Sequence, residues 1–251
     1  MIKLPYLTKE IQKIKRKESS FIGMDGGNIK SDLWFCGVEF GATLIDMEKY
    51  YAKFVKYYKI NDLEIPYRIN CSDKFLKSNF DRYLTSMYLN IFRNSESPEK
   101  EEIDDILRTE LYNKNSNIFK LNLFPFAKTD IGWQKDFDND FSITKEEYYG
   151  LLFKNRTFFL KKLLKRFSPK TIICFSPKDY SDYFVDAFFE SKESITYLKD
   201  FITLKNGKKA NIKIFSNVSI SVIIIPFLGR GNLASYNDVR EMTNYLKTNY
   251  L

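Results

Sequence analysis

The chain has 251 residues, of which 44% are hydrophobic and 29% charged, and it contains 23 Phe and 17 Tyr. These values argue against disorder and predict a folded protein with a sizeable core, one domain over residues 1–251. There is no histidine, which excludes Ser-His and Cys-His nucleophile pairs and most zinc sites. The net charge of +8 predicts a phosphate-rich partner, although lysine-rich solvated surfaces would give the same charge.

Cysteine content and apolar runs bear on the compartment. Cys36, Cys71 and Cys174 are odd in number and far apart, so they form no disulfide framework. No apolar run reaches the roughly 18 residues that a membrane-spanning helix needs, and the N-terminus carries charges and proline where a signal peptide would be apolar. We therefore expect a cytoplasmic protein without membrane contact.

Apolar patterning predicts alternating strands and helices along the chain. Strands that are buried on both faces form unalternating apolar runs, whereas surface helices repeat apolar residues every three to four positions. In chain order the pattern predicts strand Asp32–Val38, helices Thr43–Lys59 and Lys74–Phe92, strand Ile118–Leu123, helix Glu146–Phe167, strand Thr171–Phe175, a weaker helix Asp179–Glu190, strand Ile220–Pro226 and helix Ala234–Tyr250. This alternation predicts an α/β fold of three layers, with a central, mostly parallel four-stranded sheet flanked by helices.

Two stretches contain turn signals. In Ile202–Phe215, ITLKNGKKANIKIF, Asn206-Gly207 separates two alternating arms and predicts a peripheral hairpin. Its lysines, Lys205, Lys208 and Lys209 among them, either follow a phosphate backbone or decorate a solvated edge. Asp25-Gly26-Gly27-Asn28 is interpreted as a turn without a phosphate-binding pattern.

Polar residues and glycines follow each predicted strand, at the edge where open parallel sheets bind ligands. Glu39-Phe40-Gly41 comes after the first strand, and Asn122 lies at the end of the second. The fourth strand leads into Leu228-Gly229-Arg230-Gly231-Asn232. We expect a site where these segments meet.

This layout resembles the uracil-DNA glycosylase superfamily, an α/β fold whose active site is assembled at the ends of four parallel strands. Gly37-Val38-Glu39-Phe40-Gly41 falls on the family's Gly-x-Asp/Asn-Pro-Tyr/Gly loop, with Phe40 in place of proline. Asn122 in KLNLFPF matches the asparagine that reads the base edge. Ile225–Arg230 stands where the family has His-Pro-Ser or Asn-Pro-Ser and a loop that wedges into the duplex, and the family's histidine is missing.

The resemblance implies a monomeric DNA glycosylase that needs no metal or organic cofactor. It would flip out a pyrimidine nucleotide and hydrolyse the N-glycosidic bond, with Glu39 as the acid that handles water. Arg230 or Asn232 would replace the missing histidine, and Leu228 and Gly229 would belong to the wedge loop. Aromatic residues expected to cover the base are Phe40, Phe124 and Phe126.

The substrate prediction depends on Gly41. Where the uracil-specific branch has a tyrosine that blocks the 5-position of the pyrimidine, Gly41 leaves that place open. A 5-substituted pyrimidine, such as a hypermodified cytosine of phage DNA, is therefore favoured over uracil, with defence against phage as the implied role. A non-catalytic DNA-binding or regulatory module and a nucleotide hydrolase are the alternatives.

Each of these residues also has an ordinary interpretation. Glu39 can cap the following helix, where the backbone dipole favours an acid. Asn122 can close a turn before Pro125. Phe124 and Phe126 can be core residues in a chain this rich in phenylalanine.

Overall fold

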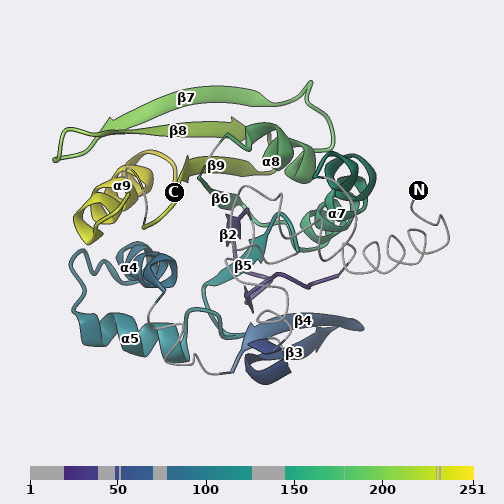
Figure 1. The fold of residues 1–251 in the computed structure, drawn as a ribbon, viewed down its shortest axis with the longest axis horizontal. Helices are drawn as coiled ribbons and strands as arrows, with labels where there is room; N and C mark the ends of the chain where they lie inside the picture. Colours follow the sequence, from purple (N-terminus) through teal and green to yellow (C-terminus); the bar gives the residue numbers. More distant parts are fainter. Residues whose placement is uncertain are drawn as a thin grey trace, which may run out of the picture.

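The fold is that of a computed structural model, which describes residues 20–38, 49–50, 52–69, 78–125, 145–177, 179–229, 231 and 233–251. Seven strands form one mixed sheet. They are β1 (Gly26–Gly27), β2 (Leu33–Gly37), β5 (Ile118–Asn122), β6 (Thr171–Ser176), β7 (Thr196–Thr203), β8 (Lys209–Ser216) and β9 (Ser221–Pro226). Their order across the sheet is β1-β5-β2-β6-β9-β8-β7, which confirms the α/β class (Figure 1).

The four predicted strands are neighbours in the middle of this sheet and run parallel to one another. β2 pairs in parallel with β5 and with β6, and β6 pairs in parallel with β9. Their sequences, LWFCG, IFKLN, TIICFS and SVIIIP, are buried almost throughout. These runs lack alternation because helices cover both of their faces.

The prediction of a mostly parallel four-stranded sheet with a peripheral hairpin was wrong in its strand count, and three of the six strand pairings in the observed sheet are antiparallel. β8 pairs antiparallel with β9 over Lys213–Ser216, so the hairpin continues the main sheet instead of standing apart. Gly207 has φ +79° in the turn between β7 and β8, a conformation that favours glycine. At the other edge, the two-residue strand β1 pairs antiparallel with β5.

Helices cover both faces of the sheet (Figure 1). α4 (Asn79–Arg93), α5 (Lys100–Thr109) and α9 (Tyr236–Asn249) pack on one face. α7 (Lys145–Phe167) and α8 (Ser181–Phe188) pack on the other. Each face has its own apolar core, which gives the three predicted layers. Among the described residues, no helix combines the length and the apolarity needed to cross a membrane.

The helix predicted over Thr43–Lys59 was wrong in its last part. Residues 52–54 are helical, but Val55–Ile60 forms strand β3, which pairs antiparallel with β4 (Leu63–Arg68). Asn61 and Asp62 have φ of 47° and 66° and make the tight turn between the strands. The run VKYYKI is rich in residues that favour strands, and pairing with β4 outweighed the helical spacing of the preceding aromatic residues.

Candidate functional site

The carboxyl ends of the four parallel strands lie at one edge of the sheet, which we call the rim. β2 ends at Gly37 and β5 ends at Asn122, and these two residues are direct register partners. β6 and β9 end at Ser176 and Pro226, which are paired in the same way. The chain that leaves β2 toward Glu39 therefore starts beside the end of β5.

Six predicted site residues lie outside the described residues: Glu39, Phe40, Gly41, Phe126, Arg230 and Asn232. Their roles stay predictions. The described chain reaches Val38 after β2 and Pro125 after β5. The structure thus describes the strand ends that flank the predicted catalytic segments, together with the remaining predicted residues.

Asn122, predicted to read a base edge, is buried and its amide is bonded within the fold. Its Nδ2 donates a hydrogen bond to the carbonyl oxygen of Gly23. Its Oδ1 lies so close to Gly37 that a Cβ added there would overlap it. In this conformation the side chain ties the ends of β2 and β5 to residue 23, and its role toward a base stays a prediction.

Phe124 and Leu228, predicted as a base-stacking ring and as a wedge, are core residues. Phe124 is 1% exposed and packs against Phe153 and Tyr180, with ring centroids 5.5 and 6.5 Å away. Leu228 is fully buried and forms a backbone bridge with Leu233. In this conformation both side chains lie within the apolar core, and their roles toward a base stay predictions.

The loop after β9 and the turn of the β7–β8 hairpin, both predicted to contact DNA, lie against each other. The Nζ of Lys208 donates a hydrogen bond to the carbonyl of Gly231 at 3.5 Å. Asn206 Nδ2 donates to Asp238 Oδ1 in the first turn of α9 at 2.6 Å. The fold therefore brings Lys208 to the glycine loop, as a shared DNA-facing surface would require.

The other described members of the predicted DNA surface are Gly229, Lys205 and Lys209. Gly229 has φ +86°, and its N–H donates to the carbonyl of Leu233 at 2.7 Å, which closes the glycine loop. Lys205 is exposed, with its Nζ 4.0 Å from the carboxylate of Glu241. Lys209 is farther from the turn, with its Nζ 4.9 Å from the centre of the Phe201 ring. DNA contact by these residues stays a prediction.

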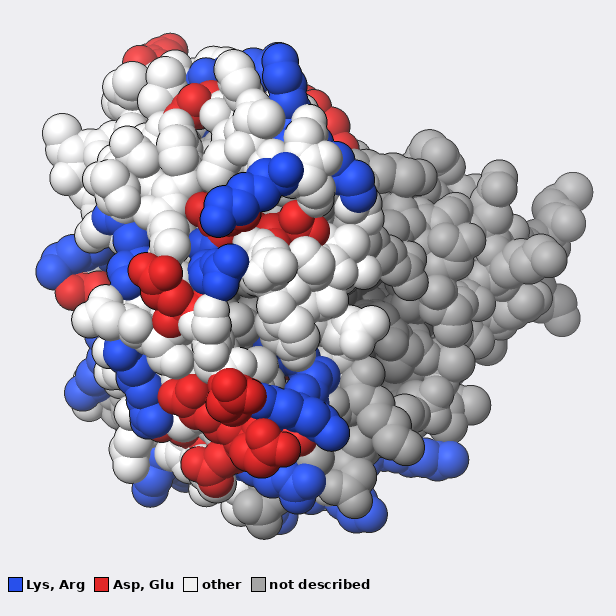
Figure 2. All heavy atoms as spheres, turned by 90° about the vertical axis from the view of Figure 1, so that its left-hand side faces the viewer, with Lys and Arg blue, Asp and Glu red and all other residues white. Residues whose placement is uncertain are grey.

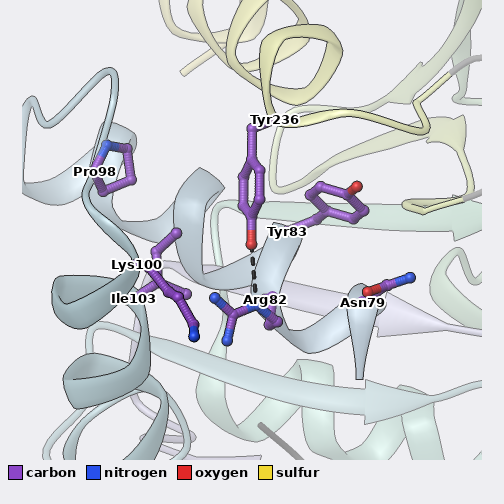
Figure 3. Close-up of a pocket in the computed structure, with 7 residues that line it drawn as sticks. All are labelled: Asn79, Arg82, Tyr83, Pro98, Lys100, Ile103 and Tyr236. Atoms are coloured by element: carbon purple, nitrogen blue, oxygen red, sulfur yellow. Dashed lines mark hydrogen bonds between the residues drawn. The ribbon is translucent and has the colours of Figure 1, made fainter. Parts of the chain in front are cut away.

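A pocket of about 680 Å³ lies between α4, α5 and the start of α9 (Figure 3). The ring of Tyr83 in this pocket would lie 3.4 Å from a Cβ on Gly229, so the pocket borders the loop after β9. Its volume falls within the roughly 300–1,000 Å³ of small-ligand sites. The lining residues are Asn79, Arg82, Tyr83, Pro98, Lys100, Ile103 and Tyr236.

Arg82 is the central polar group of this pocket. Its Nε donates a hydrogen bond to the Tyr236 hydroxyl at 3.1 Å, and its Nη1 forms an ion pair with Asp104. In Figure 3 the charged ends of Arg82 and Lys100 point into the same part of the pocket. Lys100 and the ion pair of Arg82 with Asp104 thus lie beside the rings of Tyr83 and Tyr236.

A buried charged cluster lies beneath the first turn of α4, on the same side of the sheet. The carboxylate of Asp25 forms ion pairs with Arg68 and Lys120, and all three side chains are nearly inaccessible to water. Arg68 also lies 3.9 Å from Asp81, which accepts a hydrogen bond from the Tyr112 hydroxyl at 2.5 Å. Two acids balance two cations, which is the condition for burying charge.

The pKa shifts in this cluster indicate structure and not proton transfer. Burial raises the pKa of the Asp25 carboxyl, but the charges of Lys120 and Arg68 outweigh burial and hold this pKa below its usual 3.8. Burial, reinforced by the charge of Asp81, raises the pKa of the Tyr112 hydroxyl well above 10. Asp25 is ionised and Tyr112 neutral at pH 7, so neither exchanges a proton near neutrality.

Sequence analysis missed the cluster, although two signals were present. The first signal is the pair Gly26-Gly27 directly after Asp25. Both glycines have positive φ, and they form the strand β1 instead of the predicted turn. Lys120 interrupts the apolar strand IFKLN, and a charge in a strand buried on both faces needs a counter-charge. Arg68 and Asp81 gave no local signal, because their partners are distant in sequence.

Arg156 of α7 holds the end of β5 from the opposite face of the sheet. It is fully buried, and its Nε and Nη2 donate to the carbonyls of Leu123 at 3.2 Å and Asn122 at 2.7 Å. Its Nη1 donates to the carbonyl of Ser20 at 2.7 Å. A guanidinium can serve several acceptors in a fixed plane, which a lysine ammonium cannot. Arg156 is therefore a positioning residue for the rim, and no sequence pattern indicated it.

The contact between Gly37 and Asn122 leads to a prediction. Gly37→Ala should lower the free energy of unfolding in urea by about 1–3 kcal/mol, because the new methyl group overlaps Asn122 Oδ1 in a closed part of the core. Asn122→Ala supplies the control. The double variant should lose less than the sum of the two single losses, since removing the amide makes room for the methyl group. Additive losses would contradict the contact.

Figure 2 shows the face of the molecule that carries α4, α5 and α9, the left-hand side of Figure 1. Among the described residues on this face, basic and acidic side chains are interspersed. The largest acidic group lies at the bottom, over α5, whose sequence is KEEIDDILRT. Six Lys and Arg against two Glu fall in residues 1–19, outside the described residues. A phosphate-rich partner would thus be bound by particular side chains and not by a broad basic surface here.

Comparisons of the chain with protein-family models, with curated proteins and with solved structures gave no match. Within the described ranges, His, Cys, Asp and Glu side chains form no group of three that could hold a metal ion. The function is therefore inferred from the rim, its pocket and the predicted residues around them.

Proposed function

We propose that this protein is a DNA glycosylase that extrudes a pyrimidine nucleotide and hydrolyses its N-glycosidic bond. The observation that carries the proposal is the direct register of Gly37 with Asn122 at the rim. It supports a site in which the loop containing Glu39 starts beside the end of β5, as the resemblance to the uracil-DNA glycosylase superfamily implies. The pocket beside the loop after β9, lined by Arg82 and Lys100 together with Tyr83 and Tyr236, adds space for nucleic acid near the same edge.

The proposed chemistry needs few groups. Extruding the nucleotide costs about a few kcal/mol, which contacts to the flipped base and the backbone must offset. The glycosidic bond breaks with its electron pair going to the base, which leaves an oxocarbenium-like sugar that water attacks. The Glu39 carboxylate stabilises that cation and accepts a proton from water, a contribution of about 10² to 10⁴-fold. Arg230 or Asn232 stabilises the departing anionic base.

A 5-substituted pyrimidine is the proposed substrate. Gly41 has no side chain where the uracil-specific branch of the family has a blocking tyrosine. A hypermodified cytosine of phage DNA fits this opening, so we propose excision of such bases as a defence against phage. The product is an abasic site, which alkali cleaves.

The test is an excision assay on phage DNAs that differ in pyrimidine modification. Wild-type protein should release a free base, detected by mass spectrometry, and leave alkali-labile sites. Glu39→Gln should release base about 100-fold more slowly, because the amide cannot accept the proton. Glu101→Gln on the exposed face of α5 is the matched control and should leave the rate unchanged. Release of no base from any DNA by the wild type would rule out the glycosylase.

A second function, a non-catalytic DNA-binding module, is favoured by one observation. Asn122, Phe124 and Leu228 are all engaged within the fold, so none of these three predicted side chains is poised in this conformation to read or cover a base. DNA binding that falls with salt, without base release, would support this function. Release of a base from DNA that the protein binds would exclude the non-catalytic module.

A further inference from the structure

The outer strand of the sheet presents side chains on two faces with different surroundings. β7 and β8 pair over all eight residues of each strand, and no other strand in the described part of the chain pairs with β7 (Figure 1). On β8, Ala210, Ile212 and Ile214 are buried in the core on the side of α9. Because side chains alternate along a strand, the odd-numbered residues of both strands lie on the opposite face, which we call the hairpin face.

Aromatic rings and lysines are interleaved on the hairpin face. Tyr197 and Phe201 of β7 are each 51% exposed, and Lys199 lies between them on the same face. On β8, Lys213 is the register partner of Lys199 and Asn211 that of Phe201. With Lys209, the register partner of Thr203, the face therefore combines two exposed rings with three lysines and an amide.

Neighbouring side chains hold both rings in place. The ring of Tyr197 stacks on Phe215 across the strand pair, with centroids 4.8 Å apart and planes 28° from parallel. The ammonium of Lys209 lies 4.9 Å from the centre of the Phe201 ring. Rings that are already positioned lose little conformational freedom when a flat ligand stacks on them.

The charge of the hairpin face is positive. The acid of β7, Asp200, is on the opposite face, where it accepts hydrogen bonds from the hydroxyls of Tyr245 and Tyr250 at 2.5 Å. Lys213 forms an ion pair with Asp179 at 2.7 Å, and Lys199 and Lys209 add two further ammonium groups to this face. The complementary partner is thus an anion that carries aromatic groups.

We propose that the hairpin face binds single-stranded DNA, with bases stacked on Tyr197 and Phe201 and phosphates near Lys199 and Lys209. The choice of DNA as the nucleic acid rests on the proposed function. The two rings are four residues apart, about 13 Å along an extended strand, whereas stacked bases in a duplex are about 3.4 Å apart. Rings at this spacing match the splayed bases of a single strand, and stacking on them is independent of sequence.

The test is binding of a fluorescent oligothymidine to the full chain, followed by anisotropy. Tyr197→Ala and Phe201→Ala should each weaken binding about 5-fold or more, and the double variant about 30-fold. Lys199→Ala should reduce the slope of log affinity against log salt by about 0.7, the value for one lost phosphate contact on a single strand. Phe201→Trp should keep the affinity, because it keeps a ring for stacking.

The matched control is Leu198→Ala. Leu198 is on the same strand and 48% exposed, but it lies on the opposite face, so its loss should leave binding unchanged. Equal weakening by Leu198→Ala and Phe201→Ala, or undiminished binding by the double variant, would overturn the proposal. So would a loss of self-association in the double variant during gel filtration without loss of oligothymidine binding, because the face would then be a contact between copies.

The excision assay separates this inference from the proposed function. Base release without oligothymidine binding would refute the hairpin proposal and leave the glycosylase standing. Binding that depends on Tyr197 and Phe201 without any base release would refute the glycosylase and leave the hairpin proposal standing.

Discussion

Asp25→Asn should lower the free energy of unfolding by about 3–5 kcal/mol, because it leaves Lys120 and Arg68 buried together without their shared counter-charge. Breaking a buried ion pair costs more than the pair contributes, since the remaining charge stays away from water. Urea denaturation at pH 7 measures the loss. A second variant, Asp25→Asn with Lys120→Met, should recover part of it, because it removes the uncompensated ammonium.

Asp32→Asn is the control for this prediction. Asp32 pairs with Lys170 at 2.6 Å, but the two side chains are 65% and 76% exposed, so the loss should be at most about 1 kcal/mol. Equal losses for Asp25→Asn and Asp32→Asn would contradict the role of the buried cluster.

The stabilisation that depends on Asp25 should also depend on pH. The pKa of Asp25 is lowered in the folded protein, so the unfolded chain binds a proton first as the pH falls. Its contribution is complete above the unfolded value of about 3.8 and is lost progressively below it. The difference in unfolding free energy between the wild type and Asp25→Asn should therefore shrink below about pH 4.

Arg156→Met should cost about 3–5 kcal/mol of unfolding free energy, because it leaves the carbonyls of Asn122 and Leu123 without their buried donor. Arg156→Lys should recover only a small part, since one ammonium cannot reach both carbonyls and Ser20. Thermal and urea denaturation measure both variants. Any excision activity should fall with stability, because the end of β5 loses its support.

Arg166→Met tests whether the position of the arginine decides the effect. Arg166 is on the same helix and also donates to two carbonyls, those of Ile60 and Asn61, at 3.1 and 3.2 Å. These bonds are exposed to water, so the variant should lose less than about 1 kcal/mol. Losses of similar size at Arg156 and Arg166 would contradict the assignment of Arg156 to the rim.

Parts of this fold could be predicted because their signals are local. The four parallel strands stand out since each is apolar on both faces, and Asn206-Gly207 marks the hairpin since few residues adopt its turn. Where two local patterns competed, the prediction failed. Val55–Ile60 followed aromatic residues at helical spacing, yet it paired as a strand because β4 offered a partner across a two-residue turn.

Site residues were harder to predict than strands, because a polar side chain takes its role from what surrounds it. Leu228 looked like a loop residue after a strand, and the packing of α4 and α9 made it core. Asn122 had the sequence context of a base-reading amide, and the carbonyl of Gly23, 99 residues away, became its partner. Asp25 looked like part of a turn and meets Lys120 at a separation of 95 residues.

The sequence by itself was thus enough to predict the class of fold, the parallel strands and the rim at which their ends meet, because the apolar pattern of a buried strand involves only neighbouring residues. Only the tertiary structure showed which residues form the buried ion pairs, that Arg156 supports the end of β5, and which rings are exposed on the hairpin face. The free energy of a buried donor or charge depends on which group it contacts in the folded chain. The pattern of neighbouring residues in the sequence does not determine that contact.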